Sequence, residues 1–119
     1  MALECHMFST RVRMTIEWLV PLGQTRSMTL TLHSLAADTR ATRGCVACSV
    51  SADIGKRGTV RYTEEWQTEE DLRERLRSDA FGYLAALIED ATSPPDIEFT
   101  LAHGTRGLDF VEEVRTSTR

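Results

Sequence analysis

The chain has 119 residues, which fits one domain and leaves little room for a second. Hydrophobic residues make up 41% of it and charged residues 27%, a composition typical of globular rather than disordered proteins. The formal net charge is -4 and Lys56 is the one lysine, which argues against nucleic-acid binding because that function needs clustered basic residues.

The sequence predicts neither a membrane span nor a signal peptide. No apolar run approaches the roughly 20 residues needed to cross a bilayer, and the first residues lack the apolar stretch of a signal peptide. Three cysteines cannot form a complete set of disulfides. We therefore expect a cytoplasmic protein without a membrane partner.

The N-terminal third predicts an arm, a strand and a helix. Residues 1–10 have no clear period, so we expect an N-terminal arm followed by a single domain over 11–119. Residues 12–20 alternate between apolar and polar, which predicts a half-buried strand that ends at Pro21. The next stretch has helical spacing and is expected to end at Gly44. Its inward stripe is Met28, Leu32, Leu35, Ala36 and Thr39.

The central region predicts an antiparallel hairpin. Two alternating runs, 45–53 and 59–67, flank a short loop that contains Gly55 and Gly58. The inward positions of the first run are Val46, Cys48, Val50 and Ala52. Those of the second run are Val60, Tyr62, Glu64 and Trp66.

The C-terminal half predicts a second helical region and further strands. Thr68 is a favourable N-cap before an acidic first turn, and Ser78 or Asp79 can cap a second helical piece that ends before Pro94. A fourth strand is expected over 96–103, and residues 108–115 are a candidate fifth strand at the sheet edge.

This order of elements predicts an α+β, ferredoxin-like βαββαβ fold, with a four-stranded antiparallel sheet and both helices on one face. Apolar or small residues are then expected on the uncovered face, namely Leu19, Ala47, Ala102 and Val111. Monomers rarely expose such a patch, so we expect a homodimer that packs sheet to sheet. The alternative is a monomer whose open face is polar, with Arg13, Glu17, Arg61 and Glu65 on it.

Several short features follow one another between Arg43 and Leu84. They are Gly44-Cys45 after the first helix, Glu64-x-Trp66 at the end of the hairpin, the acidic helix start at residues 68–72, and Ser78-Asp79-Ala80-Phe81. Together with the element order, this set resembles the antibiotic biosynthesis monooxygenase domain over residues 11 to 103. The resemblance implies a dimeric α+β barrel with a cavity between sheet and helices for a flat aromatic molecule. It also implies oxidation by molecular oxygen without metal or flavin.

The chain departs from the family pattern at two places. The family often has a histidine just before the phenylalanine of the second helix, where this chain has Asp79-Ala80. Haem-degrading relatives use an asparagine, and this chain contains none, which disfavours haem degradation.

Glu64 is the strongest candidate for chemistry. It lies on a predicted apolar strand face, where an isolated charge is costly to bury. It is therefore either a general base that deprotonates a phenol or quinol, or one half of a salt bridge with Arg40 or Arg43.

The other candidates are aromatic residues and a histidine. Trp66 shares its face with Tyr62 and could stack on a flat substrate, although plain core packing is the alternative. Trp18 and Phe81 are expected to shape the same cavity. His103, at the end of the fourth predicted strand, could exchange protons at the cavity mouth or simply be solvated.

Cys45 and Cys48 have CxxC spacing within a predicted strand. Three residues of strand span about 10 Å and place the two side chains on opposite faces. That geometry disfavours both a disulfide and a metal site.

The main hypothesis is a cofactor-independent, monooxygenase-like enzyme that acts on a small aromatic or quinol. Glu64, His103 and Trp66 would be catalytic, and Trp18, Tyr62 and Phe81 would bind the substrate. One alternative is a non-catalytic dimeric module that binds a hydrophobic small molecule. The other is a structural subunit that recruits another chain through the sheet edge at residues 108–115.

Overall fold

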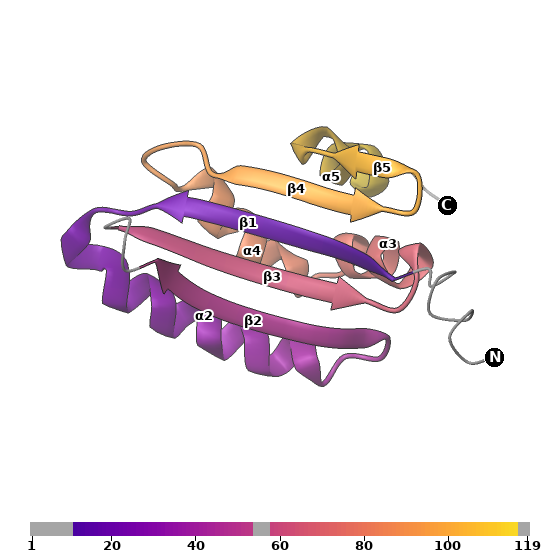
Figure 1. The fold of residues 1–119 in the computed structure, drawn as a ribbon, viewed down its shortest axis with the longest axis horizontal. Helices are drawn as coiled ribbons and strands as arrows, with labels where there is room; N and C mark the ends of the chain where they lie inside the picture. Colours follow the sequence, from indigo (N-terminus) through magenta and orange to yellow (C-terminus); the bar gives the residue numbers. More distant parts are fainter. Residues whose placement is uncertain (1–10, 54–57, 117–119) are drawn as a thin grey trace.

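The computed structural model describes residues 11–53 and 58–116 (Figure 1). The predicted arm over residues 1–10 and Gly55 of the predicted turn lie outside these ranges. The strands are β1 (Val12–Leu19), β2 (Cys45–Asp53), β3 (Thr59–Trp66), β4 (Asp96–Leu101) and β5 (Gly104–Arg106). The helices are the 3-10 segment η1 (Leu22–Gln24), α2 (Thr25–Arg40), α3 (Glu69–Arg77), α4 (Phe81–Glu89) and α5 (Leu108–Thr116).

The strands form one antiparallel sheet in the order β2-β3-β1-β4-β5. β1 lies in the middle, where Met14 pairs with Glu64 on one side and with Phe99 on the other. The first four strands have the order that the βαββαβ prediction requires. Figure 1 shows the sheet from its open side, with the helices behind it.

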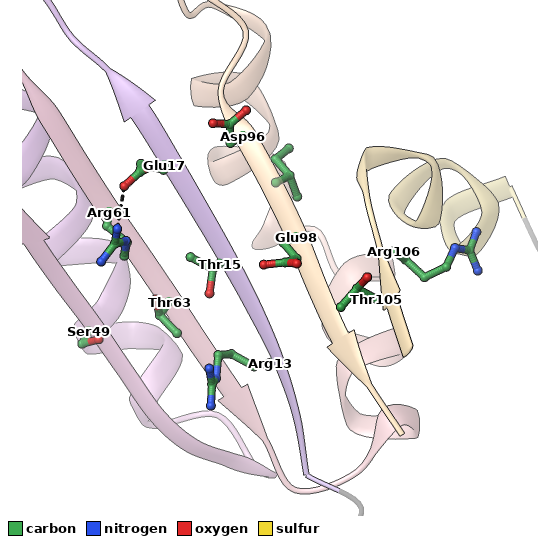
Figure 2. A pocket seen from close by; sticks show the side chains of 11 residues that line it. Arg13, Thr15, Glu17, Ser49, Arg61, Thr63, Asp96, Glu98, Thr105 and Arg106 are labelled. Atoms are coloured by element: carbon green, nitrogen blue, oxygen red, sulfur yellow. Dashed lines mark hydrogen bonds and ion pairs between the residues drawn. The ribbon is translucent and has the colours of Figure 1, made fainter. Parts of the chain in front are cut away.

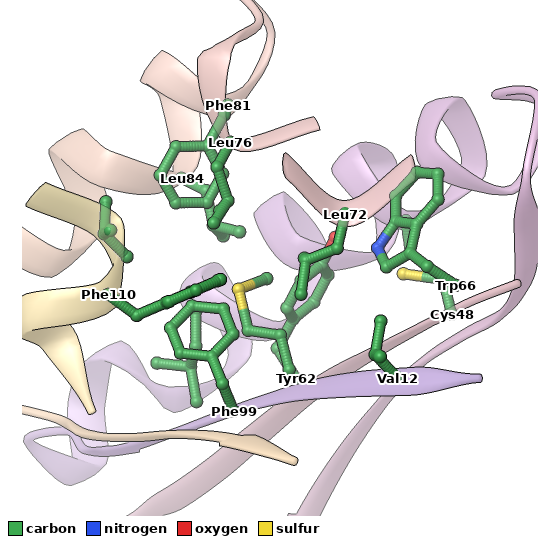
Figure 3. Packing of buried hydrophobic residues seen from close by; sticks show 14 of the residues in the cluster. Val12, Cys48, Tyr62, Trp66, Leu72, Leu76, Phe81, Leu84, Phe99 and Phe110 are labelled. Atoms are coloured by element: carbon green, nitrogen blue, oxygen red, sulfur yellow. The ribbon is translucent and has the colours of Figure 1, made fainter. Parts of the chain in front are cut away.

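The core lies between the sheet and the helices. The period-2 prediction for β1 is confirmed, because Val12, Met14, Ile16 and Trp18 are all buried. The predicted helical stripe is also confirmed, with Leu32, Ala36 and Thr39 of α2 buried against the sheet. Figure 3 shows how leucine and phenylalanine side chains from the helices complete this layer over the strands. They are Leu72, Leu76, Phe81, Leu84 and Phe110.

The predicted N-cap of α3 is confirmed, whereas the N-cap of α4 is Ala80 and neither Ser78 nor Asp79. The hydroxyl of Thr68 accepts a hydrogen bond of 3.1 Å from the backbone N–H of Asp71, as an N-cap should. The hydroxyl of Ser78 accepts one of 3.3 Å from the N–H of Phe81, at the start of α4. Local polar residues therefore divide the second helical region into α3 and α4, as the sequence predicts.

Gly44 does not end the first helix. α2 stops at Arg40, and Gly44 enters β2 with a positive φ of 90°. A Cβ at this position would lie 2.6 Å from the Cγ of Asp71, so the side chain of Asp71 occupies the space that glycine leaves free. The glycine is needed for the close approach of β2 and α3.

A β-bulge at the start of β2 corrects the prediction for its two cysteines. Cys45 pairs with Trp66, and Ala47 pairs with Glu65, so Val46 is an extra residue. One added residue exchanges the two faces of a strand, so Val46 is 38% exposed instead of buried. Cys45 and Cys48 consequently both lie on the helix-covered face, and the prediction that they point to opposite faces is wrong.

Residues 108–115 are helical, so the prediction of a strand there is wrong. The fifth strand is instead the short β5, which pairs with β4. In α5 the buried residues are Phe110, Val111 and Val114, which follow helical spacing. The sequence LDFVEEV also fits a period of two, and this ambiguity caused the error.

The open face of the sheet is largely polar. It carries charged and hydroxyl side chains from β1, β3 and β4, including an exposed ion pair of 2.7 Å between Arg61 and Glu17 (Figure 2). Leu19 is 62% exposed, but Val111 is buried in α5 and so does not belong to the expected apolar patch. The open face is thus polar, as the alternative prediction of a monomer expected, and the sheet-to-sheet dimer stays a prediction.

None of the described helices is both long and apolar enough to cross a membrane.

Candidate functional site

A pocket of about 250 Å³ lies on the helix-covered side of the sheet. α2 and the residues after it supply one wall, and α3 and α4 supply the other. The lining residues are Leu35, Asp38, Thr39, Thr42, Arg75, Ala80 and Tyr83. Arg75 is 7% exposed, whereas Tyr83 is 69% exposed, so the pocket runs from a buried cation to an accessible phenol.

Arg75 is held in place by Glu64. Its Nε donates to both carboxylate oxygens of Glu64, at 3.2 and 3.1 Å, and its Nη2 donates to Oε2 at 2.7 Å. Nη2 also donates to the hydroxyl of Thr39 at 3.2 Å. None of the hydrogen bonds of Arg75 with described residues uses Nη1. The N–H groups of Nη1 are therefore not taken up by Glu64 or Thr39, and Arg75 is one of the residues that line the pocket.

Glu64 is fully buried and accepts hydrogen bonds from two further side chains. The Tyr62 hydroxyl donates to Oε2 at 2.6 Å, and the Trp66 indole N–H donates to Oε1 at 2.9 Å. A buried carboxylate is tolerated when it is paired and hydrogen-bonded, and these contacts meet both conditions. We call Glu64, Arg75, Tyr62, Trp66 and Thr39 the Glu64 cluster.

The cluster fixes the protonation of its members. Burial alone would lower the pKa of Arg75, but the hydrogen bonds and the charge of Glu64 outweigh it and raise that pKa, so the guanidinium stays charged. Burial and then the charge of Glu64 raise the pKa of Tyr62. Burial raises the pKa of Cys48 to about 11, although a hydrogen bond with Tyr62 opposes the shift. The phenol and the thiol are therefore neutral at neutral pH.

The structure brings together three of the residues predicted for the site, Glu64, Trp66 and Tyr62. The salt bridge considered for Glu64 exists, but the predicted partners are wrong. Its partner is Arg75, while the Nε of Arg40 donates to the backbone oxygen of Cys48 at 2.9 Å.

The remaining predicted residues lie elsewhere. Trp18 is buried, and its indole donates to the backbone oxygen of Leu87 at 3.3 Å, beside a separate small pocket. Phe81 is buried with the guanidinium of Arg75 over its ring at 5.6 Å, and it lines a groove between α4 and α5. His103 is exposed in the turn between β4 and β5, beyond the end of the strand predicted to carry it. The described contacts do not join it to the Glu64 cluster.

Sequence reasoning missed Arg75, Asp38 and Tyr83. A signal for Arg75 was present, because Leu72, Arg75 and Leu76 follow the spacing of one buried helix face. A cation on a stripe of leucines is the natural partner for a carboxylate on an apolar strand face. Asp38 and Tyr83 have no such signal, since both lie on exposed helix surface.

A larger hollow, of about 770 Å³, lies on the open face of the sheet (Figure 2). Its walls are charged or hydroxyl side chains that solvent reaches, such as Arg13, Arg61 and Glu98. A flat apolar molecule needs aromatic or aliphatic walls and a few directed polar groups, so the pocket beside the Glu64 cluster is the better candidate site.

Comparisons with known proteins agree with this architecture. The model of the antibiotic biosynthesis monooxygenase family matches residues 11–86. A conserved protein from Methanosarcina mazei Go1 has a TM-score of 0.68 at 21% identity, over 76% of this chain and 91% of that one. A candidate antibiotic biosynthesis monooxygenase from Deinococcus radiodurans has a TM-score of 0.68 at 18% identity, and the match covers 76% of this chain and 91% of that one. A search of curated proteins found no match.

A further candidate antibiotic biosynthesis monooxygenase, from Caulobacter crescentus CB15, has a TM-score of 0.67 at 18% identity and covers 84% of this chain and 97% of that one. At such low identity these structures show the shared fold, and they confirm the predicted α+β class. The family match itself covers more than half of the chain, from the first strand into α4. The chain therefore belongs to the antibiotic biosynthesis monooxygenase family.

Proposed function

We propose that this protein is a cofactor-independent, monooxygenase-like enzyme that oxidises a small aromatic or quinol in the pocket between α2 and α4. The observation that carries the proposal is the buried, charged Arg75, which lines the pocket and whose hydrogen bonds to Glu64 and Thr39 do not use Nη1. A preorganised donor of this kind stabilises negative charge that develops on a substrate oxygen.

The proposed reaction needs a proton acceptor and an oxyanion donor. Removal of a proton from the substrate gives an enolate or phenolate, whose oxygen accepts from Nη1 of Arg75. The carbanion form then adds molecular oxygen, so that a CH₂ group becomes a carbonyl and the second oxygen atom leaves as water. Exclusion of bulk water at the buried end of the pocket favours the charged intermediate on Arg75.

Within this proposal Glu64 positions Arg75. Its oxygens already accept from Arg75, Tyr62 and Trp66, and protonation would leave the buried guanidinium without its counter-charge. Asp38, exposed at the pocket, is the carboxylate free to take the substrate proton. His103 remains a predicted proton carrier that the geometry does not support.

The volume of the pocket limits the substrate. Pockets for drug-sized molecules hold about 300–1,000 Å³, and this one is smaller. We therefore expect a substrate with one or two rings rather than a larger polycyclic molecule.

The test is oxygen uptake over a panel of small hydroquinones and hydroxyaryl ketones, with purified protein freed of metal by chelation. We expect consumption of one oxygen molecule per substrate and a drop of about 10²–10³-fold in kcat for Arg75→Lys, which moves the donor. Asp38→Asn should lower kcat by about 10²-fold and leave folding intact. No uptake with any member of the panel, together with measurable binding, would favour the non-catalytic binding module. The replacement of the family's histidine by Asp79-Ala80 supports that second candidate.

We also propose that a second copy of the chain covers the open sheet face. β4 contributes the acids Asp96 and Glu98, while Arg13 and Arg61 lie on β1 and β3. A two-fold axis could place Arg13 of one face over Asp96 or Glu98 of the other, although Arg61 is already paired with Glu17 within its own chain. Sedimentation at increasing salt tests this, because such a pair should dissociate as the charges are screened. A monomer at low salt and micromolar concentration would contradict it.

A further inference from the structure

The charges around the pocket define what it can bind. Among its lining residues only Arg75 and Asp38 are charged. The charge of Arg75 is already balanced by Glu64, whose Oε2 lies 2.7 Å from Nη2 and is fully buried. The pair is neutral as a whole, so Asp38 leaves the pocket with a net negative charge.

Arg75 nevertheless offers a directed donor. The N–H groups of Nη1 can bond to an acceptor in the pocket, and this requires no net positive charge around them. The pocket thus combines a hydrogen-bond donor with a slightly negative surrounding. This combination suits a neutral oxygen acceptor, such as a ketone carbonyl.

A carboxylate in the same position would meet two opposing effects. It would lose part of its hydration at the end of the pocket formed by the buried Arg75 and Thr39, and it would lie near the negative charges of Glu64 and Asp38. No unpaired cation lines the pocket to compensate for that cost. A neutral carbonyl has a much smaller desolvation cost and keeps the same hydrogen bond.

We infer that the pocket binds a neutral hydroxyaryl ketone with one or two rings and rejects the corresponding aryl carboxylate, with Glu64 and Asp38 as specificity-determining residues. The carbonyl oxygen accepts from Nη1 of Arg75, and the ring lies between Leu35 and the exposed phenol of Tyr83. This inference deepens the proposed function by naming the substrate class of the same pocket, but it concerns binding and does not require turnover.

The test uses two probes of nearly equal shape, 2′-hydroxyacetophenone and salicylate. The chain has two tryptophans, so its indole N–H signals in NMR spectra report separately on Trp66, in the Glu64 cluster, and on Trp18, beside another pocket. We expect the ketone to shift the Trp66 signal and to bind at least about tenfold more tightly than salicylate.

Charge variants of the protein test the cause. Asp38→Asn removes a surface charge without touching the core, and it should narrow the preference for the ketone several-fold. Glu64→Gln frees the charge of Arg75 and should reverse the preference in favour of salicylate. Glu65→Gln is the matched control, because Glu65 lies on the open face, and it should leave the ratio unchanged.

Several results would overturn the inference. One is equal or tighter binding of salicylate than of the ketone by the natural protein. Another is a ratio of the two dissociation constants that stays the same in Asp38→Asn. A third is a shift of the Trp18 signal without a shift of the Trp66 signal. Lack of ketone binding at millimolar concentration would do the same. If Glu64→Gln does not fold, Asp38→Asn decides alone. A ketone preference without oxygen uptake would support the inference while contradicting the proposed enzyme, so the two failures are distinguishable.

Discussion

Glu64 and Glu65 are neighbours in the sequence and lie in different environments. Glu64 points to the helices, is fully buried and receives hydrogen bonds from Arg75, Tyr62 and Trp66. Glu65 points to the open face of the same strand and is half-buried there. Strand alternation thus separates a carboxylate that organises a polar network in the core from one that belongs to a surface. The comparison predicts that the same substitution will have very different effects on the two faces.

The largest difference is expected for the arginines. Arg75→Met leaves the carboxylate of Glu64 buried without its counter-charge and should lower the free energy of unfolding by about 3–5 kcal/mol. Arg61→Met breaks the exposed pair with Glu17 on the open face and should cost about 0–1 kcal/mol. Urea denaturation measures both. The double variant Glu64→Gln/Arg75→Met should be more stable than Arg75→Met alone, and an additive loss would contradict the pairing.

The tyrosines give the next largest contrast. Tyr62→Phe removes the hydroxyl that donates to Glu64 at 2.6 Å and should lower the free energy of unfolding by about 1.5–3 kcal/mol. Tyr83→Phe changes an exposed phenol of the pocket and should leave stability within about 0.5 kcal/mol. Thermal unfolding of both variants provides the comparison. Equal effects would mean that the Tyr62 hydroxyl adds nothing to the cluster.

Alkaline pH should lower the free energy of unfolding through Cys48, which is buried on the helix-covered face. Burial raises the pKa of the Cys48 thiol from 9.0 to about 11, so between these values the folded chain keeps a proton that the unfolded chain releases. Stability is therefore expected to be complete below about pH 9 and to fall as the pH rises toward 11. Urea midpoints between pH 8 and 11 test this. The decline should be shallower in Cys48→Ala, and an unchanged slope would assign it to other groups.

The smallest effect is expected on the open face itself. Glu65→Gln should change the unfolding free energy of the monomer by no more than about 0.5 kcal/mol, since no core contact depends on it. Its influence should appear in association, because a charge on a surface that meets a second copy alters the salt dependence of the pair. Sedimentation of this variant against the natural chain measures that influence.

Local patterns predicted most of the fold. Alternation in β1 and β3, the stripe of α2 and the cap at Thr68 each depend on residues close in sequence, and each is confirmed. The errors arose where one residue altered the period or where two periods fit equally well. The extra residue Val46 changed which side chains at the start of β2 face the helices, and residues 108–115 fit both strand and helix spacing.

The site was predictable only in part, because its parts come from distant segments. The sequence singled out Glu64, Tyr62 and Trp66, which share one strand face. Their link to Arg75 depends on how α3 crosses the sheet, and no local period encodes that crossing. The free Nη1 and the pocket beside it follow from this contact between elements and were not visible beforehand.

The bulge at Val46 also has a consequence for how this chain can meet others. It lies at the first residues of β2, which is the border strand on one side of the sheet, and at the other border β5 is three residues long. The two borders therefore differ, because β2 pairs regularly with β3 from Ala47 to Asp53, whereas β5 offers only three residues. A strand of another chain could add to the regular part of β2 but not across its first residues, where the bulge changes the direction of the backbone groups.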